Sequence, residues 1–256
     1  MTTVSLTSPR AASTWSALLR TESRLLARQP AILIWTVILP VAAIIVMAAI
    51  PAARRPQDGF GGLSVLQAYQ PTLMIFASSM MALQMLPVLL GQYRELGYLR
   101  RLRTTPVSPW QLLGALLVLM LLVTMAIGVL MAIVPLLVGV GEAARAPSIL
   151  GVLLPTTLAF LAVGALIAAV IPSSRVAGGA GAALAAVMWF AAGMWFPRAM
   201  FPGWLAAIAD WTPGGAAAAA MTDVAVGAAP GWQPFVCLAL WFVVSLAIAV
   251  RAFRWE

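Results

Sequence analysis

The charged residues that could take part in chemistry are concentrated in one short segment, residues 91–110, GQYRELGYLRRLRTTPVSPW. It holds four arginines and a glutamate, although charged residues make up only 9% of the chain, and it lies between two long apolar stretches. A short cationic element of this kind could sit in a cleft on another protein. It could equally be a solvated basic loop that only orients the helices beside it. The spacing of the residues leaves both interpretations open.

The residue types that the chain lacks exclude several kinds of site. Without histidine there is no Ser–His protease and no histidine metal site. The single cysteine, Cys237, can form neither a disulfide framework nor a zinc site. All fifteen basic residues are arginine, so the phosphate-binding GK[ST] loop of a Walker-type ATPase is absent. We therefore expect this chain to hold no catalytic residues, no metal and no cofactor.

The elements that must position the charged segment are apolar helices. Hydrophobic residues make up 63% of the 256 residues, too many for the surface of a soluble domain. Six uninterrupted apolar stretches are long enough to cross about 30 Å of hydrocarbon as helices. They are residues 31–50, 69–92, 111–140, 148–171, 178–196 and 233–250. The predicted fold class is an all-α integral membrane protein with six transmembrane helices.

The distribution of arginine predicts the orientation of these spans. An even number of spans places both termini on one side of the membrane. If that side is the cytoplasm, eleven arginines lie in inner segments and four in outer ones: Arg54, Arg55, Arg145 and Arg198. Cytoplasmic loops carry an excess of basic residues, so the predicted topology has both termini inside. Arginines that flank spans also explain the net charge of +8 better than nucleic-acid binding does.

The first thirty residues form a separate cytoplasmic segment, and residues 31–256 form the six-span domain. Residues 13–28 have the pattern of an amphipathic helix that lies along the inner membrane surface. Glu22 projects from the middle of its apolar face. This carboxylate could contact a partner protein, or it could be lifted to the lipid headgroups or paired locally with an arginine.

Two further features concern the membrane. No charged residue lies inside the predicted spans, although ion-driven transporters usually need a carboxylate at membrane depth. Any energy must therefore come from outside this polypeptide. The outer segment 197–232 is too broken by proline and glycine to span, yet too apolar for an ordinary loop. Its tryptophans suit the membrane–water interface. We expect two short helices there, at about 203–210 and 215–226, that lie on or re-enter the outer leaflet.

The segment YRELGYLRRLRTTPVSPWQLLGALL resembles the cytoplasmic loop of ABC-2-type transporter permeases, in particular the actinobacterial branch similar to daunorubicin-resistance exporters. That branch has an acidic residue, a glycine and then L-R-R-L-R-T-T-P-V-S-P, positions occupied here by Glu95, Gly97 and residues 99–109. Upstream the match departs from the pattern, because Gln92 and Tyr93 stand where a second acidic residue is common. The N-terminal helix, the six spans and the outer FPGWLAAIADWTP are also similar to the family.

The resemblance implies a permease subunit in a bacterial cell membrane. It would pair with a second permease, identical or homologous, and with two cytosolic ATP-binding subunits that carry the ATP and Mg²⁺. In this family the loop, here 93–110, and the N-terminal helix contact the ATPases. The residues expected to couple the chain to its ATPases are Glu22, Arg94, Glu95, Gly97, Arg100, Arg101, Arg103, Thr105 and Pro106.

The leading hypothesis is an exporter of an amphipathic, lipid-soluble compound such as a drug or antibiotic. Methionine and aromatic surfaces re-pack around varied hydrophobic ligands, although such stripes are more often plain helix packing. On this basis the expected substrate path comprises Phe76, Met80, Gln84, Met85 and Trp189. Two alternatives stay open: the same architecture exporting a lipid, glycan or peptide, and a membrane scaffold or sensor subunit that transports nothing.

Overall fold

The computed structural model describes residues 11–28, 30, 34–60, 62–98, 108–140 and 142–252. Over these residues the backbone is mostly helical, and the only β-type pairing is an isolated bridge between Pro56 and Ser64. Five helices are long and apolar enough to cross a membrane: Val65–Glu95, Trp110–Leu137, Ala143–Val170, Ser174–Ala191 and Trp232–Ala252. A shorter apolar helix covers Ile34–Ala49. The prediction of an all-α membrane protein is confirmed.

The elements follow one another in this order. The N-terminal helix is α1 (Ala11–Ala27), and the next apolar stretch contains a π-helical segment, η1 (Ile34–Ile38), and α3 (Leu39–Ala49). The second span consists of α4 (Val65–Ser79), the π-helical η4 (Met80–Met85) and α5 (Leu86–Glu95). The remaining helices are α7 (Pro109–Leu137), α8 (Ala146–Val170), α9 (Ser174–Ala191), α10 (Gly203–Asp210), α11 (Pro213–Ala225) and α12 (Trp232–Ala252). Short 3₁₀ turns are η2 (Pro51–Arg54), η3 (Asp58–Phe60), η5 (Ala143–Arg145) and η6 (Arg198–Met200).

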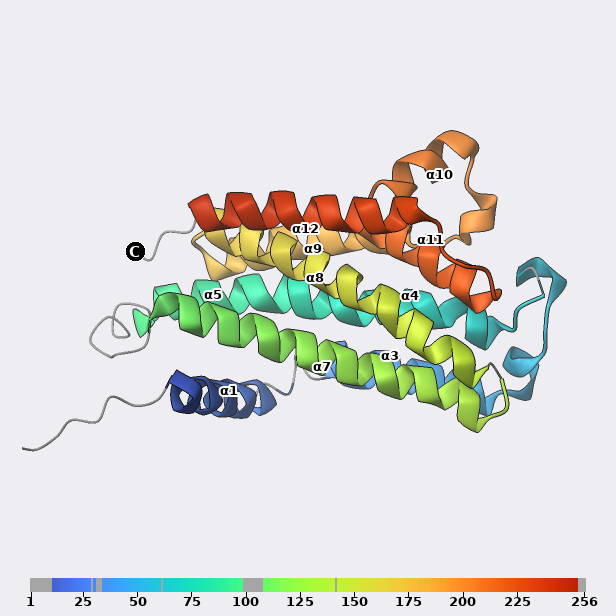
Figure 1. The fold of residues 1–256 in the computed structure, drawn as a ribbon, viewed down its shortest axis with the longest axis horizontal. Helices are drawn as coiled ribbons and strands as arrows, with labels where there is room; N and C mark the ends of the chain where they lie inside the picture. The colour runs from blue at the N-terminus through green and yellow to red at the C-terminus, as the bar shows by residue number, and fades with distance from the viewer. Residues whose placement is uncertain are drawn as a thin grey trace, which may run out of the picture.

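The long helices pack side by side, with α8 in contact with α4, α5, α7, α9, α11 and α12 (Figure 1). At one end of the bundle lie α1, the end of α5 and the α8–α9 connection; we call it the α1 end. At the opposite end lie η2, η3, α10 and the α7–α8 connection; we call it the α10 end. Helix α1 packs on α7, where a Cβ atom added to Gly114 would lie 2.8 Å from the ring of Trp15.

The predicted span limits agree with the described helix ends to within about five residues, and the fifth span differs most. The described helix of the first span, Ile34–Ala49, is about 24 Å long at 1.5 Å per residue. Residues 31–33 of that prediction lie outside the described part of the chain. The fifth helix begins at Ser174 and ends at Ala191, earlier than predicted at both ends. It ends there because Gly193 adopts a positive φ of 84°.

Each π-helical segment ends two residues before a proline. The segment η1 is followed by Pro40, and η4 is followed by Pro87. A proline has no N–H for the carbonyl four residues earlier, and its ring clashes with that carbonyl in an α-helix. Widening the helix by one residue moves the carbonyl aside. In η4 the carbonyl oxygens of Ala82 and Leu83 consequently lie directly against Gly164 of α8 and Gly181 of α9.

The two outer helices predicted in 197–232 are confirmed as helices α10 and α11, and they differ in environment. Helix α11 packs among α4, α8, α9 and α12, and Ala216, Ala217 and Met221 are fully buried. Helix α10 stands out at the edge of the bundle (Figure 1), with Trp204 67% and Ile208 59% exposed. The small alanines and glycines of α11 explain its insertion, because only short side chains fit between packed helices.

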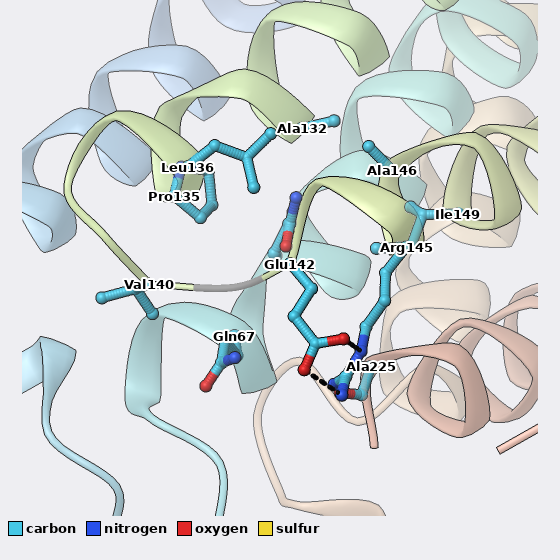
Figure 2. A pocket seen from close by; sticks show the side chains of 11 residues that line it. Gln67, Ala132, Pro135, Leu136, Val140, Glu142, Arg145, Ala146, Ile149 and Ala225 are labelled. Atoms are coloured by element: carbon cyan, nitrogen blue, oxygen red, sulfur yellow. Dashed lines mark hydrogen bonds and ion pairs between the residues drawn. The ribbon is translucent and has the colours of Figure 1, made fainter. Parts of the chain in front are cut away.

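Three of the four arginines at the α10 end bond to the C-terminal turn of a helix. Arg54 donates to the carbonyl of Ala48 in α3, and Arg198 donates to that of Ala191 in α9. Arg145 pairs with Glu142 and also donates to the carbonyl of Ala225 at the end of α11 (Figure 2). The last carbonyls of a helix have no partner within it and attract cations. These arginines therefore fix the ends of helices.

Candidate coupling site

The last residues of α5 hold neighbouring helices at the α1 end. The Tyr93 hydroxyl donates to Glu22 Oε2 of α1 at 2.7 Å. The next residue, Arg94, donates through Nη1 to the carbonyl oxygen of Ala168 in the last turn of α8. Consecutive side chains on a helix point about 100° apart, so adjacent residues can reach different neighbours.

Glu95, which follows them, caps the N-terminus of α9. Its Oε1 accepts a hydrogen bond from the backbone N of Ser174, and its Oε2 accepts one from Ser174 Oγ, both at 2.8 Å. The first N–H groups of a helix lack partners within it, and a carboxylate there also favours the helix dipole. One turn earlier, a Cβ atom on Gly91 would lie 2.7 Å from the Cα of Ser174, so the two backbones touch. The end of α5 and the start of α9 are thus locked together.

The Glu22 carboxylate is buried inside the chain, with 2% of the residue exposed. It lies among apolar side chains of α1, η4, α5 and α7 that line a small pocket with it: Leu25, Leu26, Met85, Leu89, Leu116, Leu119 and Met120. The ring of Tyr93 also packs on that of Tyr98, with centroids 4.9 Å apart. Burial raises the pKa of Glu22, and the hydrogen bond from Tyr93 opposes this rise.

The turn after α5 explains Gly97. This residue has a positive φ of 64°, and its N–H bonds to the carbonyl of Arg94 at 2.9 Å. A left-handed residue at this point ends an α-helix, and glycine takes that conformation without strain. The chain re-enters a helix at Ser108, whose Oγ accepts from Gln111 N while Gln111 Oε1 accepts from Ser108 N. This capping box begins α7 at Pro109, two residues before the predicted limit of the third span.

The comparison with known protein families decides the identity of this architecture. The family model described as ABC-2 type transporter matches residues 13–226. The match runs from α1 through α11 and contains Glu22, the end of α5 and Ser174. The chain belongs to the ABC-2 type transporter family. No curated protein sequence matches it significantly.

Membership of the ABC-2 family makes the chain a multi-pass membrane component of a transporter. Members of this family associate with ATP-binding subunits, and their usual location is the bacterial plasma membrane. The family resemblance drawn from residues 93–117 is therefore confirmed. The nearer likeness to daunorubicin-resistance exporters stays a prediction.

The predicted coupling residues of this ABC-2 protein divide into two groups. Glu22, Arg94, Glu95 and Gly97 all lie at the α1 end, where the first three join α5 to other helices. The others lie outside the described residues, and their role stays a prediction: Arg100, Arg101, Arg103, Thr105 and Pro106. Glu22 faces the chain's own α5 and α7, a position that the sequence reasoning did not consider.

Four of the five predicted substrate-path residues form two contacting pairs, one of which joins the second span to Trp189 of α9. The rings of Phe76 and Trp189 are 4.8 Å apart, and Trp189 Nε1 donates to Ser79 Oγ at 2.7 Å. Gln84 Nε2 lies 2.8 Å from the sulfur of Met80, and both side chains are partly exposed. Met85 lies elsewhere, buried in the pocket beside Glu22. Met85 is therefore separated from the other four, because it follows Gln84 directly and consecutive side chains of a helix point in different directions.

Two contributors to the site were missed by the sequence reasoning. Ser174 was not singled out, and Tyr93 was noted only as a departure from the family pattern. Their partners are 79 and 71 residues away. The one available signal was Glu22 itself, because a carboxylate in the middle of an apolar face needs a buried hydrogen-bond donor.

Replacing Glu22 with glutamine is expected to strengthen the packing of α1 in a pH-dependent way. The pKa of Glu22 is raised above its ordinary 4.5, so the folded protein favours the protonated carboxyl. The contribution of Glu22 to folded-state stability is therefore present below pH 4.5 and is lost as the pH rises through the raised pKa. Glutamine stays neutral and keeps an acceptor for Tyr93. At about pH 8 we expect the α1 amides of Glu22→Gln to exchange hydrogen about fivefold more slowly than in the wild type.

The difference in exchange rate between Glu22→Gln and the wild type should narrow as the pH approaches 4.5. Comparing the two proteins at each pH removes the intrinsic pH dependence of exchange. Glu142→Gln, which changes an exposed carboxylate at the α10 end, serves as the control. A ratio between the two proteins that is the same at every pH would contradict the assignment.

Proposed function

We propose that the chain is the membrane-spanning permease subunit of an ATP-powered exporter. It would work with a second permease and with two cytosolic ATP-binding subunits, which would supply the ATP and Mg²⁺. Family membership supports the transporter role. The observation that carries the mechanism is the end of α5, where Tyr93, Arg94 and Glu95 bond to α1, α8 and α9 in turn.

The geometry favours mechanical coupling through loop 93–110. A displacement of this loop by an ATP-binding subunit would pull on α5 and, through its last three residues, on three further helices. Packed helices move as rigid bodies rather than deforming, so the spans would tilt together. Glu22 would act in this scheme by tying α1 to α5, and Arg100, Arg101 and Arg103 would supply the contact with the ATPase.

The same proposal places the α1 end in the cytoplasm, with six spans and both termini inside. The excess of arginine in the segments at this end supports it. The exposed Trp204 of α10 and Trp211, which follows it, then lie at the outer interface, where indole rings are favoured.

The proposed cargo is an amphipathic compound. The partly exposed Met80, Gln84 and Trp189 supply a surface of sulfur, amide and aromatic groups on the second and fifth spans. Such a surface adapts to varied hydrophobic ligands while offering a few hydrogen bonds.

The experiment that tests this function uses the complex purified with its ATP-binding subunits and reconstituted in liposomes. Replacing Arg100, Arg101 and Arg103 together with alanine should lower the substrate-stimulated ATPase rate about fivefold. Arg55→Ala, at the α10 end, is the control and should leave that rate unchanged.

Two results would overturn the proposal. One is solute transport by the chain alone, with no ATP-binding subunit present. The other is normal coupling in the triple variant, which would remove the loop from the mechanism. A complex that assembles but transports nothing tested would favour the scaffold or sensor alternative.

A further inference from the structure

A cavity of about 310 Å³ lies at the α10 end, far from the coupling site. Its walls come from three separate parts of the chain: the η3 turn with the start of α4, the segment after α9, and the end of α11. Small-molecule sites typically occupy about 300–1,000 Å³. The pocket beside Arg145, in Figure 2, is a much smaller space of about 30 Å³ that shares Gln67 and Ala225 with this cavity.

Hydrogen bonds fix each wall of the cavity. At the start of α4, Gln67 Oε1 accepts from Ser64 N at 3.0 Å, and Ser64 Oγ accepts from Gln67 N at 3.2 Å. Arg198 donates to the carbonyl of Ala191 at 2.7 Å and pairs with Asp210. The cavity is therefore preformed, because these bonds keep its walls from collapsing onto one another.

The third wall, the end of α11, is held from outside the cavity. Arg145 donates to the carbonyl of Ala225. Its guanidinium lies against Gly227, where an added Cβ would be 3.1 Å from Nη2. Gly227 has a positive φ of 84° and ends α11. The cation and the glycine together fix the position of the helix end that closes the cavity.

The lining of the cavity is mostly apolar and includes two aromatic rings. Phe60 and Tyr69 pack edge to face, with centroids 6.1 Å apart and an interplanar angle of 68°. A few polar groups accompany them, among them the side chains of Gln67, Thr72 and Thr222. This combination of rings with a small number of hydrogen-bonding groups is typical of sites for drug-sized molecules.

The charges around the cavity favour an uncharged ligand. Among the described lining residues, Arg198 is the only one that is charged at neutral pH, and Asp210 already neutralises it. An anionic ligand would have to compete with Asp210 for the guanidinium. A cationic ligand would find no carboxylate in the described lining, and burying an unpaired charge is costly.

We propose that this cavity is a binding site for an uncharged amphipathic molecule with a flat ring system. The rings of Phe60 and Tyr69 would contact the apolar part, and Gln67 and Thr72 would bind its polar groups. This site goes beyond the proposed coupling function. It lies within one chain and needs no ATP-binding subunit to be complete.

The test uses the full chain in lipid nanodiscs, without ATPase. In a Cys237→Ala background, Ala68→Cys places a thiol in the cavity wall, and Ala207→Cys places one on the exposed face of α10. The probe is N-phenyl-1-naphthylamine, which is uncharged, and its anionic counterpart is 8-anilinonaphthalene-1-sulfonate. At about ten times its dissociation constant, the uncharged probe should slow maleimide labelling of Ala68→Cys about tenfold.

Labelling of Ala207→Cys should stay unchanged, and the sulfonate at equal concentration should protect Ala68→Cys less. Added to the Ala68→Cys protein, Tyr69→Ala should abolish the protection, and Tyr69→Phe should retain it. Tyr69→Phe also shows that the fold tolerates change at this position.

The proposal would be overturned by no protection of Ala68→Cys, by equal protection at Ala207→Cys, or by equal protection by the sulfonate. Slow labelling that is relieved only by removing lipid would show that a lipid occupies the cavity, which also contradicts it. Because no ATP-binding subunit is present in this experiment, a negative result would not contradict the proposed coupling function. A normal ATPase rate in the triple arginine variant likewise would not contradict the proposed binding site.

Discussion

Alanine in place of Gly181 is expected to destabilise the protein by about 3 kcal/mol or more. A Cβ atom at Gly181 would overlap the carbonyl oxygen of Leu83 in η4, and one at Gly164 would overlap that of Ala82. Backbone atoms cannot move aside as a flexible side chain can, so α8 or α9 would have to separate from the second span. The measurement is the midpoint of thermal unfolding in nanodiscs.

The same helices provide matched controls. Added Cβ atoms at Gly179 of α9 and Gly151 of α8 would meet nothing within 4 Å. Gly179→Ala and Gly151→Ala should therefore stabilise slightly, by about 0.5–1 kcal/mol, because alanine favours helix over glycine. The substitutions two residues apart in α9 thus have expected effects of opposite sign. Similar midpoints for Gly179→Ala and Gly181→Ala would show that α9 does not pack on η4 in this register.

Removal of the Glu95 side chain is expected to lower ATP-driven transport about tenfold or more while the complex still assembles. This prediction rests on the proposed function. Glu95→Ala removes both acceptors for Ser174, so α9 loses its link to the end of α5. Glu95→Gln keeps one acceptor oxygen and should show an intermediate rate. Transport into inverted vesicles and copurification of the ATP-binding subunits are measured on the same preparations.

Glu142→Ala is the control for loss of a carboxylate, because Glu142 pairs with Arg145 at the opposite end of the molecule. Two results would contradict the assignment of Glu95. Loss of the ATP-binding subunits in Glu95→Ala would mean that Glu95 contacts them directly. Unchanged transport would mean that the link to α9 carries no motion.

Local patterns in the sequence were sufficient for much of the fold. Apolar length identified the long helices, because a segment that crosses hydrocarbon must satisfy its backbone internally and carry apolar side chains. Local patterns also indicate where helices begin, as at Ser108, where serine, proline and glutamine stand at the positions of a capping box. The two outer helices followed from short apolar runs between proline and glycine, and α10 has the bounds predicted for it.

Local patterns indicated only some of the residues of the site. The pattern around Glu95 and Gly97 pointed to the segment whose residues bond to α8 and α9, and Glu22 stood out as a carboxylate on an apolar face. Its contact with Tyr93 could not be inferred, because the two residues are 71 positions apart and either of two environments would have satisfied the carboxylate. The burial of Met85 beside Glu22 could not be inferred either, since apolar composition does not say which side of a helix faces the core.

The sequence by itself determined that this is a helical membrane protein whose arginine-rich loop joins its second and third apolar segments. Those properties depend on composition and spacing along the chain, which are local. The tertiary structure alone decided that Tyr93, Arg94 and Glu95 hold α1, α8 and α9, and that Gly164 and Gly181 accept the carbonyls of η4. Those contacts depend on how helices far apart in the chain rotate and pack against one another, and a change of register by one residue would turn each side chain to another neighbour.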